Sequence, residues 1–190
     1  VFNFAEPDKN HFLAVKEIIN SGTTLVLSAG NSPMSTDHSD VANIPGVVLV
    51  SSVNSDNQHG PTGHAHNQWV DLCAPGDNVT TTLPGTYGGT GGTSFAAPFV
   101  SGTIGLMLSV NSLLTPQLIE NLLESSTDPI ADGSSYPNLL GAGRLNAYKA
   151  VLAACNQCGG INNPAQYVQN LNIIQSASYT KCYIVSSNVT

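Results

Sequence analysis

The chain has 190 residues, of which 41% are hydrophobic and 9% are charged, and its formal net charge is −7. This length allows one sizeable core, and the low charge excludes a disordered chain, which needs high charge and few apolar side chains. With only 5 Lys and Arg residues there is no basic stripe, so the composition argues against nucleic-acid binding. The longest apolar runs, such as 24–27 and 47–50, are too short to cross a bilayer, and we expect no membrane span.

Strands and a helix alternate in the first half of the chain. We predict a strand at 1–4, a helix at 11–20 ended by Ser21-Gly22, and buried strands at 23–28, 47–53 and 69–74. This order is typical of an α/β fold with a mostly parallel sheet flanked by helices. In such sheets ligands bind beyond the carboxyl ends of the strands, so the loops after Ser28 and Val53 are the places where we expect a site.

The second half is predicted to be mainly helical. Short extended pieces at 79–83 and 86–92 flank a Pro-Gly turn, and helices are predicted at 93–110, from Thr115-Pro116 to about Ser125, and at 144–154. The helix at 93–110 is apolar nearly all round, which is typical of a helix in the centre of a larger protein. The first residue is Val1 rather than Met, and the last four residues stop within a strand-like stretch, so we expect a fragment cut at both ends.

The four cysteines favour an oxidising compartment. Cys155 and Cys158 form a lone C-x-x-C; a structural zinc site needs four ligands, and a redox dithiol needs a βαβ context that is missing here. A disulfide is the favoured interpretation, and it predicts a secreted or extracytoplasmic protein. Cys73 lies in an apolar stretch and is predicted to be a buried small hydrophobe. The composition changes after residue 154, so we predict a first domain at 1–154 and a β-rich tail or further module at 155–190.

The strongest chemical signal is the segment 92–98, Gly-Thr-Ser-Phe-Ala-Ala-Pro, at the start of the long predicted helix. Glycine permits a close backbone approach, and the serine falls at a helix N-terminus, where free N–H groups favour a developing oxyanion. A serine at this position is most often only a helix cap. The sequence G-x-S-x-G of the α/β-hydrolases does not fit, because no glycine stands two places after Ser94.

This segment resembles the nucleophile motif G-T-S-x-A-x-P of the subtilisin-like serine peptidases, and the resemblance covers about residues 1–153, the C-terminal half of a catalytic domain. It implies a subtilisin-like fold that is incomplete on its N-terminal side, with Ser94 as nucleophile. Ser28-Ala29-Gly30-Asn31 is similar to the family's A-A-G-N segment, which implies that Asn31 and the N–H of Ser94 form the oxyanion hole. A polypeptide substrate is implied as well.

The resemblance also implies the substrate cleft and a cation site. Val1, Phe2 and Asn3 would pair with the substrate backbone, although Phe4 departs from the family's glycine. Ser28, Ala29 and Gly30 would form the opposite wall of the primary specificity pocket. Thr90 and Gly91 would line its leaving-group side, and Thr93 would be a further substrate-binding residue. The segment 70–76, Val-Asp-Leu-Cys-Ala-Pro-Gly, is similar to V-D-x-x-A-P-G, and in some members a structural calcium binds there; its ligands here would be Asp71 and the carbonyls of Pro45 and Val47. No cofactor is required for the implied chemistry.

A serine nucleophile needs a base, and neither the D-x-G nor the H-G-T motif of the family occurs in this chain. We predict that none of the five histidines, at positions 11, 38, 59, 64 and 66, is that base. His64 and His66 form an H-x-H pair that could bind a metal, but solvated loop histidines are the favoured interpretation.

Two main hypotheses follow. The first is a subtilisin-like serine endopeptidase, present as a fragment that needs the upstream half of its domain and is inactive alone. The alternative is a non-catalytic pseudo-peptidase or protein-binding module on the same fold. A further hypothesis makes the tail a surface-attachment or secretion module, which independent folding of that segment would support.

Overall fold

The computed structural model describes residues 9–59 and 64–157. The elements are α1 (Lys9–Asn20), β1 (Leu25–Ser28), β2 (Val47–Val53), β3 (Leu72–Pro75), β4 (Val79–Leu83), β5 (Thr86–Thr90), α2 (Thr93–Val110), α3 (Pro116–Ser125), a short 3-10 helix (Gly133–Ser135) and α4 (Ala147–Asn156). The predicted strand at 1–4 and the predicted β-rich tail lie outside the described residues, apart from the first residues of the tail, which belong to α4.

The sheet is parallel, as predicted, with the order β1-β2-β3. Leu25 pairs with Val47 and Val50 pairs with Leu72, so the carboxyl ends of all three strands lie at one edge. The connection between β1 and β2 contains turns but no helix. β4 and β5 form a separate antiparallel hairpin around the predicted Pro-Gly turn.

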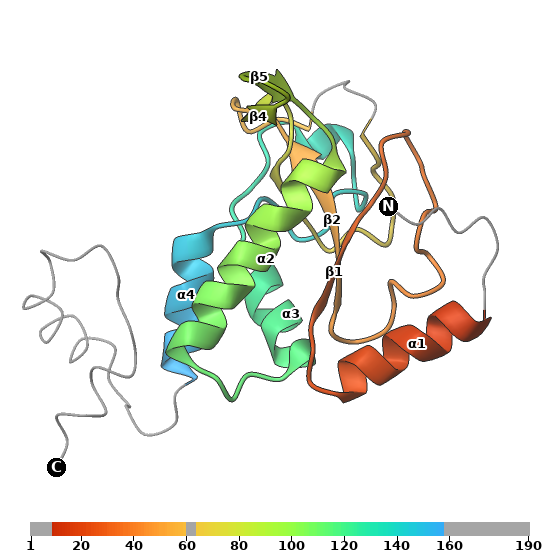
Figure 1. The fold of residues 1–190 in the computed structure, drawn as a ribbon, viewed down its shortest axis with the longest axis vertical. Coiled ribbons are helices and arrows are strands. Elements are labelled where there is room, and N and C mark those ends of the chain that lie inside the picture. Colours follow the sequence, from red (N-terminus) through yellow and green to blue (C-terminus); the bar gives the residue numbers. More distant parts are fainter. Residues whose placement is uncertain (1–8, 60–63, 158–190) are drawn as a thin grey trace, which may run out of the picture.

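Side chains of β2 alternate between the two faces of the sheet, because successive residues of a strand point to opposite sides. Val48 and Val50 pack with α2, α3 and α4 in the largest core cluster, whereas Leu49 and Val53 pack on the opposite face. All seven residues of β2 are buried. Figure 1 shows α2 crossing the molecule beside α4, which in turn packs against α3, with α1 near the lower end of β1.

α2 spans the residues that its apolar pattern predicts, and it remains partly uncovered. By length and composition it could span a membrane, a test that core helices of water-soluble proteins also pass. Its buried face, which includes Val100 and Met107, packs on the sheet and on α4. Phe99 and Leu106 on its other side are each 45% exposed. An apolar helix face of this kind is typical of a surface that further protein covers.

The start of α4 corrects one prediction: this helix begins at Ala147 and not at Arg144. Asn146 is the N-cap residue, and its side chain accepts a hydrogen bond from Lys149 N at 3.0 Å. Arg144 is instead extended, and its backbone pairs with Asp128 and Cys73. A capping asparagine competes with the helix interior for backbone hydrogen bonds, which stops the helix there.

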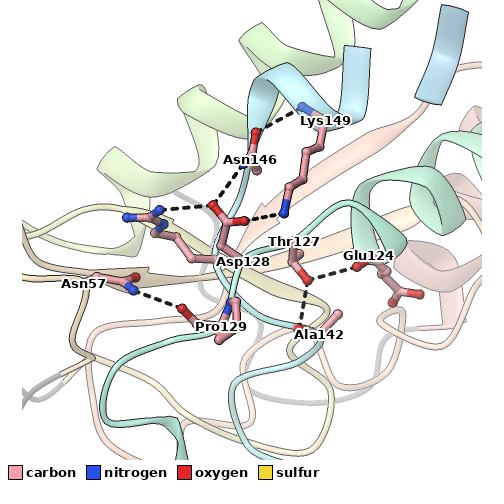
Figure 2. A network of polar contacts seen from close by, with 9 residues as sticks. Asn57, Glu124, Thr127, Asp128, Pro129, Ala142, Asn146 and Lys149 are labelled. Carbon is pink, nitrogen blue, oxygen red and sulfur yellow. Dashed lines mark hydrogen bonds and ion pairs between the residues drawn. The ribbon is translucent and has the colours of Figure 1, made fainter. Parts of the chain in front are cut away.

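Asp128 is the centre of a polar network that fixes α4 to the segment after α3 (Figure 2). Its carboxylate accepts hydrogen bonds from Lys149 Nζ at 2.7 Å, Asn146 Nδ2 at 2.9 Å and an Arg144 guanidinium nitrogen at 3.2 Å. These hydrogen bonds lower the pKa of Asp128 to about 2. Asn57 Nδ2 donates to Pro129 O nearby, which ties in the loop after β2.

The cysteines fit their predicted roles where the structure describes them. Cys73 carries a free thiol that is fully buried, and burial raises its pKa to about 12. Cys155 is disulfide-bonded.

Candidate active site

Ser94 lies in the first turn of α2 and is exposed to solvent. The residue at the N-cap is Gly92, whose φ of 145° is a conformation that side chains rarely adopt. The first N–H groups of a helix have no partner within the helix, and here they lie at the serine. The arrangement presents a hydroxyl beside backbone donors, which suits stabilisation of an anion at Ser94.

The side chain of Asn31 is held against this helix terminus. Its Oδ1 accepts a hydrogen bond from Thr93 N at 2.9 Å. A backbone N–H can only donate, so the oxygen of the amide must face Thr93 and Nδ2 must face away from it. A Cβ on Gly92 would lie 3.1 Å from Asn31 Nδ2, so a side chain there would crowd the amide. The donor atom of Asn31, Nδ2, therefore points away from Thr93 N.

Thr93 connects the loop after β1 to the start of α2, and the place where these two segments meet is called the corner below. Its hydroxyl accepts a hydrogen bond from Gly30 N at 3.1 Å and lies 3.1 Å from Gly30 O and 3.2 Å from Asn31 Oδ1. The residue is fully buried. The loop after β1 and the start of α2 are thus joined by a small, closed set of hydrogen bonds, which restricts the position of Asn31 relative to Ser94.

A third loop, the one after β3, packs under the same corner. Gly76 N donates to Val53 O at 3.0 Å, and Gly92 N donates to Gly76 O at 2.7 Å. A Cβ on Gly76 would lie 2.7 Å from Ser52 Cβ and 3.0 Å from Ala96 Cβ. Glycine at 76 and alanine at 96 are therefore needed for the helix to approach the sheet this closely.

The other predicted substrate residues are distributed around this corner. Ser28, Gly30 and Thr90 are partly exposed and Gly91 is exposed, whereas Ala29 is as fully buried as Thr93. Val1, Phe2 and Asn3 lie outside the described residues.

The histidines correct a second prediction, since His64 is buried rather than solvated and His66 is half-buried; His59 is buried too. His59 is 1% exposed and His64 is 8% exposed. His59 Nδ1 bonds Ser52 O at 3.0 Å, and His64 Nδ1 bonds Ser52 Oγ, so both pack against the end of β2. Burial lowers the pKa of each. His11, elsewhere, pairs with Asp40 at 3.0 Å.

The predicted cation site contains two carboxylates that sequence reasoning missed. Asp71, Glu120 and Glu124 each place an oxygen within 4.8 Å of the others. Glu120 also accepts from Gly46 N at 2.5 Å, which brings it to the turn that contains Pro45 and Val47. Glu120 and Glu124 are four residues apart on α3 and so share one face of it; that spacing was the available signal.

The electrostatics of this cluster suit a hard cation. Burial and the nearby charges of Glu120 and Glu124, opposed by the hydrogen bond from Leu49 N at 2.6 Å, together raise the pKa of Asp71 to about 7. Burial also raises the pKa of Glu120 and of Glu124. Carboxylate and carbonyl oxygens are the ligands of calcium, so this donor set fits that ion.

Comparison with known proteins assigns the arrangement to one family. The sequence profile of the Subtilase family, Peptidase S8, matches residues 4–173. Subtilisin from Bacillus pumilus is 36% identical over 140 residues, which are 72% of this chain and 49% of that protein. Subtilisin E from Bacillus subtilis (strain 168) is 34% identical over 72% of this chain and 35% of its own length. The chain thus spans about a third to a half of these curated relatives.

Solved structures agree with the sequence matches. The self-cleaved protease domain of PatA has a TM-score of 0.66 and 29% identity, covering 82% of this chain and 58% of that one. A protease from Pseudoalteromonas arctica PAMC 21717 has a TM-score of 0.62 and 27% identity, covering 77% and 47%. The prenylagaramide maturation protease PagA, with a TM-score of 0.67 and 23% identity, supports the fold alone.

Proposed function

The chain belongs to the subtilase family of serine peptidases, and on that premise we propose that it is the C-terminal half of a serine endopeptidase domain whose nucleophile is Ser94. The observation that carries the proposal is the hydrogen bond from Thr93 N to Asn31 Oδ1, because it holds the side chain of Asn31 at the residue that precedes Ser94 and turns its amide donor away from Thr93 N. A helix-capping serine would need no such neighbour.

The proposed reaction is acyl transfer to Ser94. Its Oγ attacks the peptide carbonyl carbon while its proton passes to a histidine of the upstream half, and the carbonyl oxygen becomes an oxyanion. Asn31 Nδ2 and the N–H of Ser94 donate to that oxyanion. The amine then leaves with the proton that the histidine held, and water releases the acyl group from Ser94. An aspartate, also upstream, would orient the histidine.

The exposed side of α2 supports a missing partner of this kind. Phe99 and Leu106, which are two turns apart on one side, are each 45% exposed on a helix whose composition is that of a buried one. We propose that the upstream half of the domain covers this face and thereby brings its base to Ser94. We further propose an extracytoplasmic location, since one relative is named an extracellular protease of Xanthomonas campestris and Cys155 is disulfide-bonded.

A fluorophosphonate probe tests the proposal directly. The complete protein should be labelled at Ser94, and chain 1–190 alone should be labelled at least about 1,000-fold more slowly, because a hydroxyl without its base is a weak nucleophile. Mass spectrometry of the labelled peptide identifies the serine. Equal labelling rates would contradict the need for the upstream half. A complete protein that is folded and not labelled would favour the pseudo-peptidase alternative.

We also propose a structural calcium ion at Asp71, Glu120 and Glu124, which would neutralise buried negative charge and take no part in the reaction. In EDTA, ionisation of Asp71 destabilises the fold, because its pKa of about 7 in the folded state lies above its ordinary value of 3.8. The contribution of this group to stability is therefore present below pH 4 and is lost as the pH rises to about 7 and above.

The expected result is a calcium-dependent Tm that is also pH-dependent. In the complete protein, millimolar calcium should raise Tm at pH 8 by about 3 °C or more and much less at pH 5, where protonated carboxyls bind poorly. Asp71→Asn should remove the calcium effect and flatten the pH dependence in EDTA. Asp56→Asn, which changes an exposed carboxylate elsewhere, is the control; an unchanged calcium response in Asp71→Asn would rule out this site.

A further inference from the structure

His59 and His66 form a pair of imidazoles that the proposed peptidase function does not use. His59 Nε2 and His66 Nδ1 lie 3.2 Å apart, and the rings are nearly perpendicular, with an interplanar angle of 88°. His59 is buried and His66 is half-buried. The pair follows β2 in the sequence and lies beside the end of that strand, where His59 contacts Ser52.

The hydrogen bonds determine which nitrogen of His59 carries its proton. Ser52 O can only accept, so the contact at 3.0 Å requires Nδ1 of His59 to be protonated. In the neutral ring Nε2 then carries a lone pair, and that lone pair faces His66 Nδ1. Burial lowers the pKa of His59, which favours this neutral form at ordinary pH. An outer N–H bonded to a backbone carbonyl is the arrangement that orients most metal-binding histidines.

The separation of the two nitrogens also matches one coordinated ion. Two bonds of about 2.0–2.1 Å to a tetrahedral zinc ion place their nitrogens about 3.3 Å apart. The two nitrogens are therefore as far apart as coordination requires, and each ring needs only to turn until its lone pair points at the ion instead of at the other nitrogen. Imidazole nitrogens select Zn²⁺ and Cu²⁺ over calcium or magnesium, which prefer oxygen.

The surroundings hold both rings in place. Tyr136 packs against His59 with ring centroids 4.8 Å apart and against His66 at 4.9 Å. Asp132 accepts a hydrogen bond from His59 N at 2.8 Å, so the segment around the 3-10 helix fixes the backbone as well as the ring. Rings fixed in this way lose little freedom on binding an ion, and this lowers the entropic penalty of coordination.

We propose that His59 Nε2 and His66 Nδ1 form a binding site for a zinc-like divalent cation, with water in the remaining coordination positions. Coordination requires His66 to carry its own proton on Nε2, and no net proton is released when both rings start neutral. The ion would link His59 to His66 and so stabilise these two residues beside the end of β2. The site is separate from Ser94 and does not depend on the proposed catalytic activity.

The test is a zinc titration of the complete protein, purified without a histidine tag and stripped of metal. Calorimetry at pH 7.5, with 1 mM calcium present to occupy oxygen sites, should detect one zinc ion bound at this site. His66→Gln should weaken binding by at least about 10-fold, since losing even an outer-shell partner costs 10- to 100-fold. Because His66 is half-buried, we expect this variant to keep the metal-free Tm of the parent.

His11→Gln is the matched control, because it removes a partly buried histidine that pairs with Asp40 in another part of the fold. It should leave zinc affinity unchanged. Cu²⁺ provides a second readout that does not depend on a variant: its electron paramagnetic resonance spectrum should show coupling to two imidazole nitrogens in the parent and to one in His66→Gln. Absence of zinc binding in the parent, equal affinity in His66→Gln, or loss of binding in His11→Gln would each overturn the proposal; the first would leave a pair that only shares a proton.

Discussion

Replacing Ser94 by alanine in the complete protein should abolish peptide hydrolysis while leaving the fold intact. The expected loss in kcat is roughly a million-fold, which is the loss known for the corresponding serine of subtilisin and so a family expectation rather than a value derived from this chain. Because Ser94 is exposed, its removal leaves no cavity and no unpaired buried group. The measurement is kcat/KM on a chromogenic peptide, alongside a thermal unfolding curve.

Ser101→Ala is the matched control for that experiment. Ser101 is an exposed serine on the same helix, and its hydroxyl bonds Ala97 O at 3.2 Å. Its loss should change neither activity nor Tm appreciably. Retained hydrolysis in Ser94→Ala at more than about one part in 1,000 would contradict its role as nucleophile.

Replacing Asn31 should lower kcat by roughly 100- to 1,000-fold with little change in KM, the range known for one oxyanion donor in subtilisin itself. The physical reason is that Nδ2 bonds the substrate oxygen only when that oxygen becomes negative, so the bond stabilises the transition state more than the bound substrate. Two replacements separate this role from a structural one. Asn31→Leu removes both the donor and the acceptor, whereas Asn31→Asp keeps the acceptor for Thr93 N.

Asn31→Asp should therefore retain more of the parent Tm than Asn31→Leu and yet lose at least as much activity, because a carboxylate offers no donor and repels the oxyanion. Steady-state kinetics and thermal unfolding of both variants make the comparison. If activity followed Tm across the two variants, Asn31 would act only by holding Thr93 in place.

The local elements of this fold were largely predictable because their signals are local. α2 begins and ends where its apolar pattern does, and α3 begins at Pro116, with Thr115 as its cap. Arg144 shows the limit of such reasoning. Its side chain suits a helix, but the cap at Asn146 and the pairing with Asp128 and Cys73 keep it extended, and those contacts come from distant parts of the chain.

The candidate site divides in the same way. Ser94 and Asn31 were predicted from short motifs, and their proposed roles as nucleophile and oxyanion donor each need fixed local neighbours. The carboxylates that join Asp71 come from α3, about fifty residues further along the chain, and only the packing of α3 against the sheet brings them together. His59 and His66 are only seven residues apart in the sequence, but the polar composition around them favoured solvent exposure of the histidines there.

The sequence by itself determined the family and the α/β class, and it predicted the nucleophile and its oxyanion partner, because each of these signals is encoded in contiguous residues. The tertiary structure alone decided which charged and imidazole groups are buried beside one another, since burial depends on what the rest of the chain packs over a residue. The tertiary structure also decided that one apolar side of α2 is exposed. The reason is that an apolar helix pattern predicts that a face is buried but not which segment covers it.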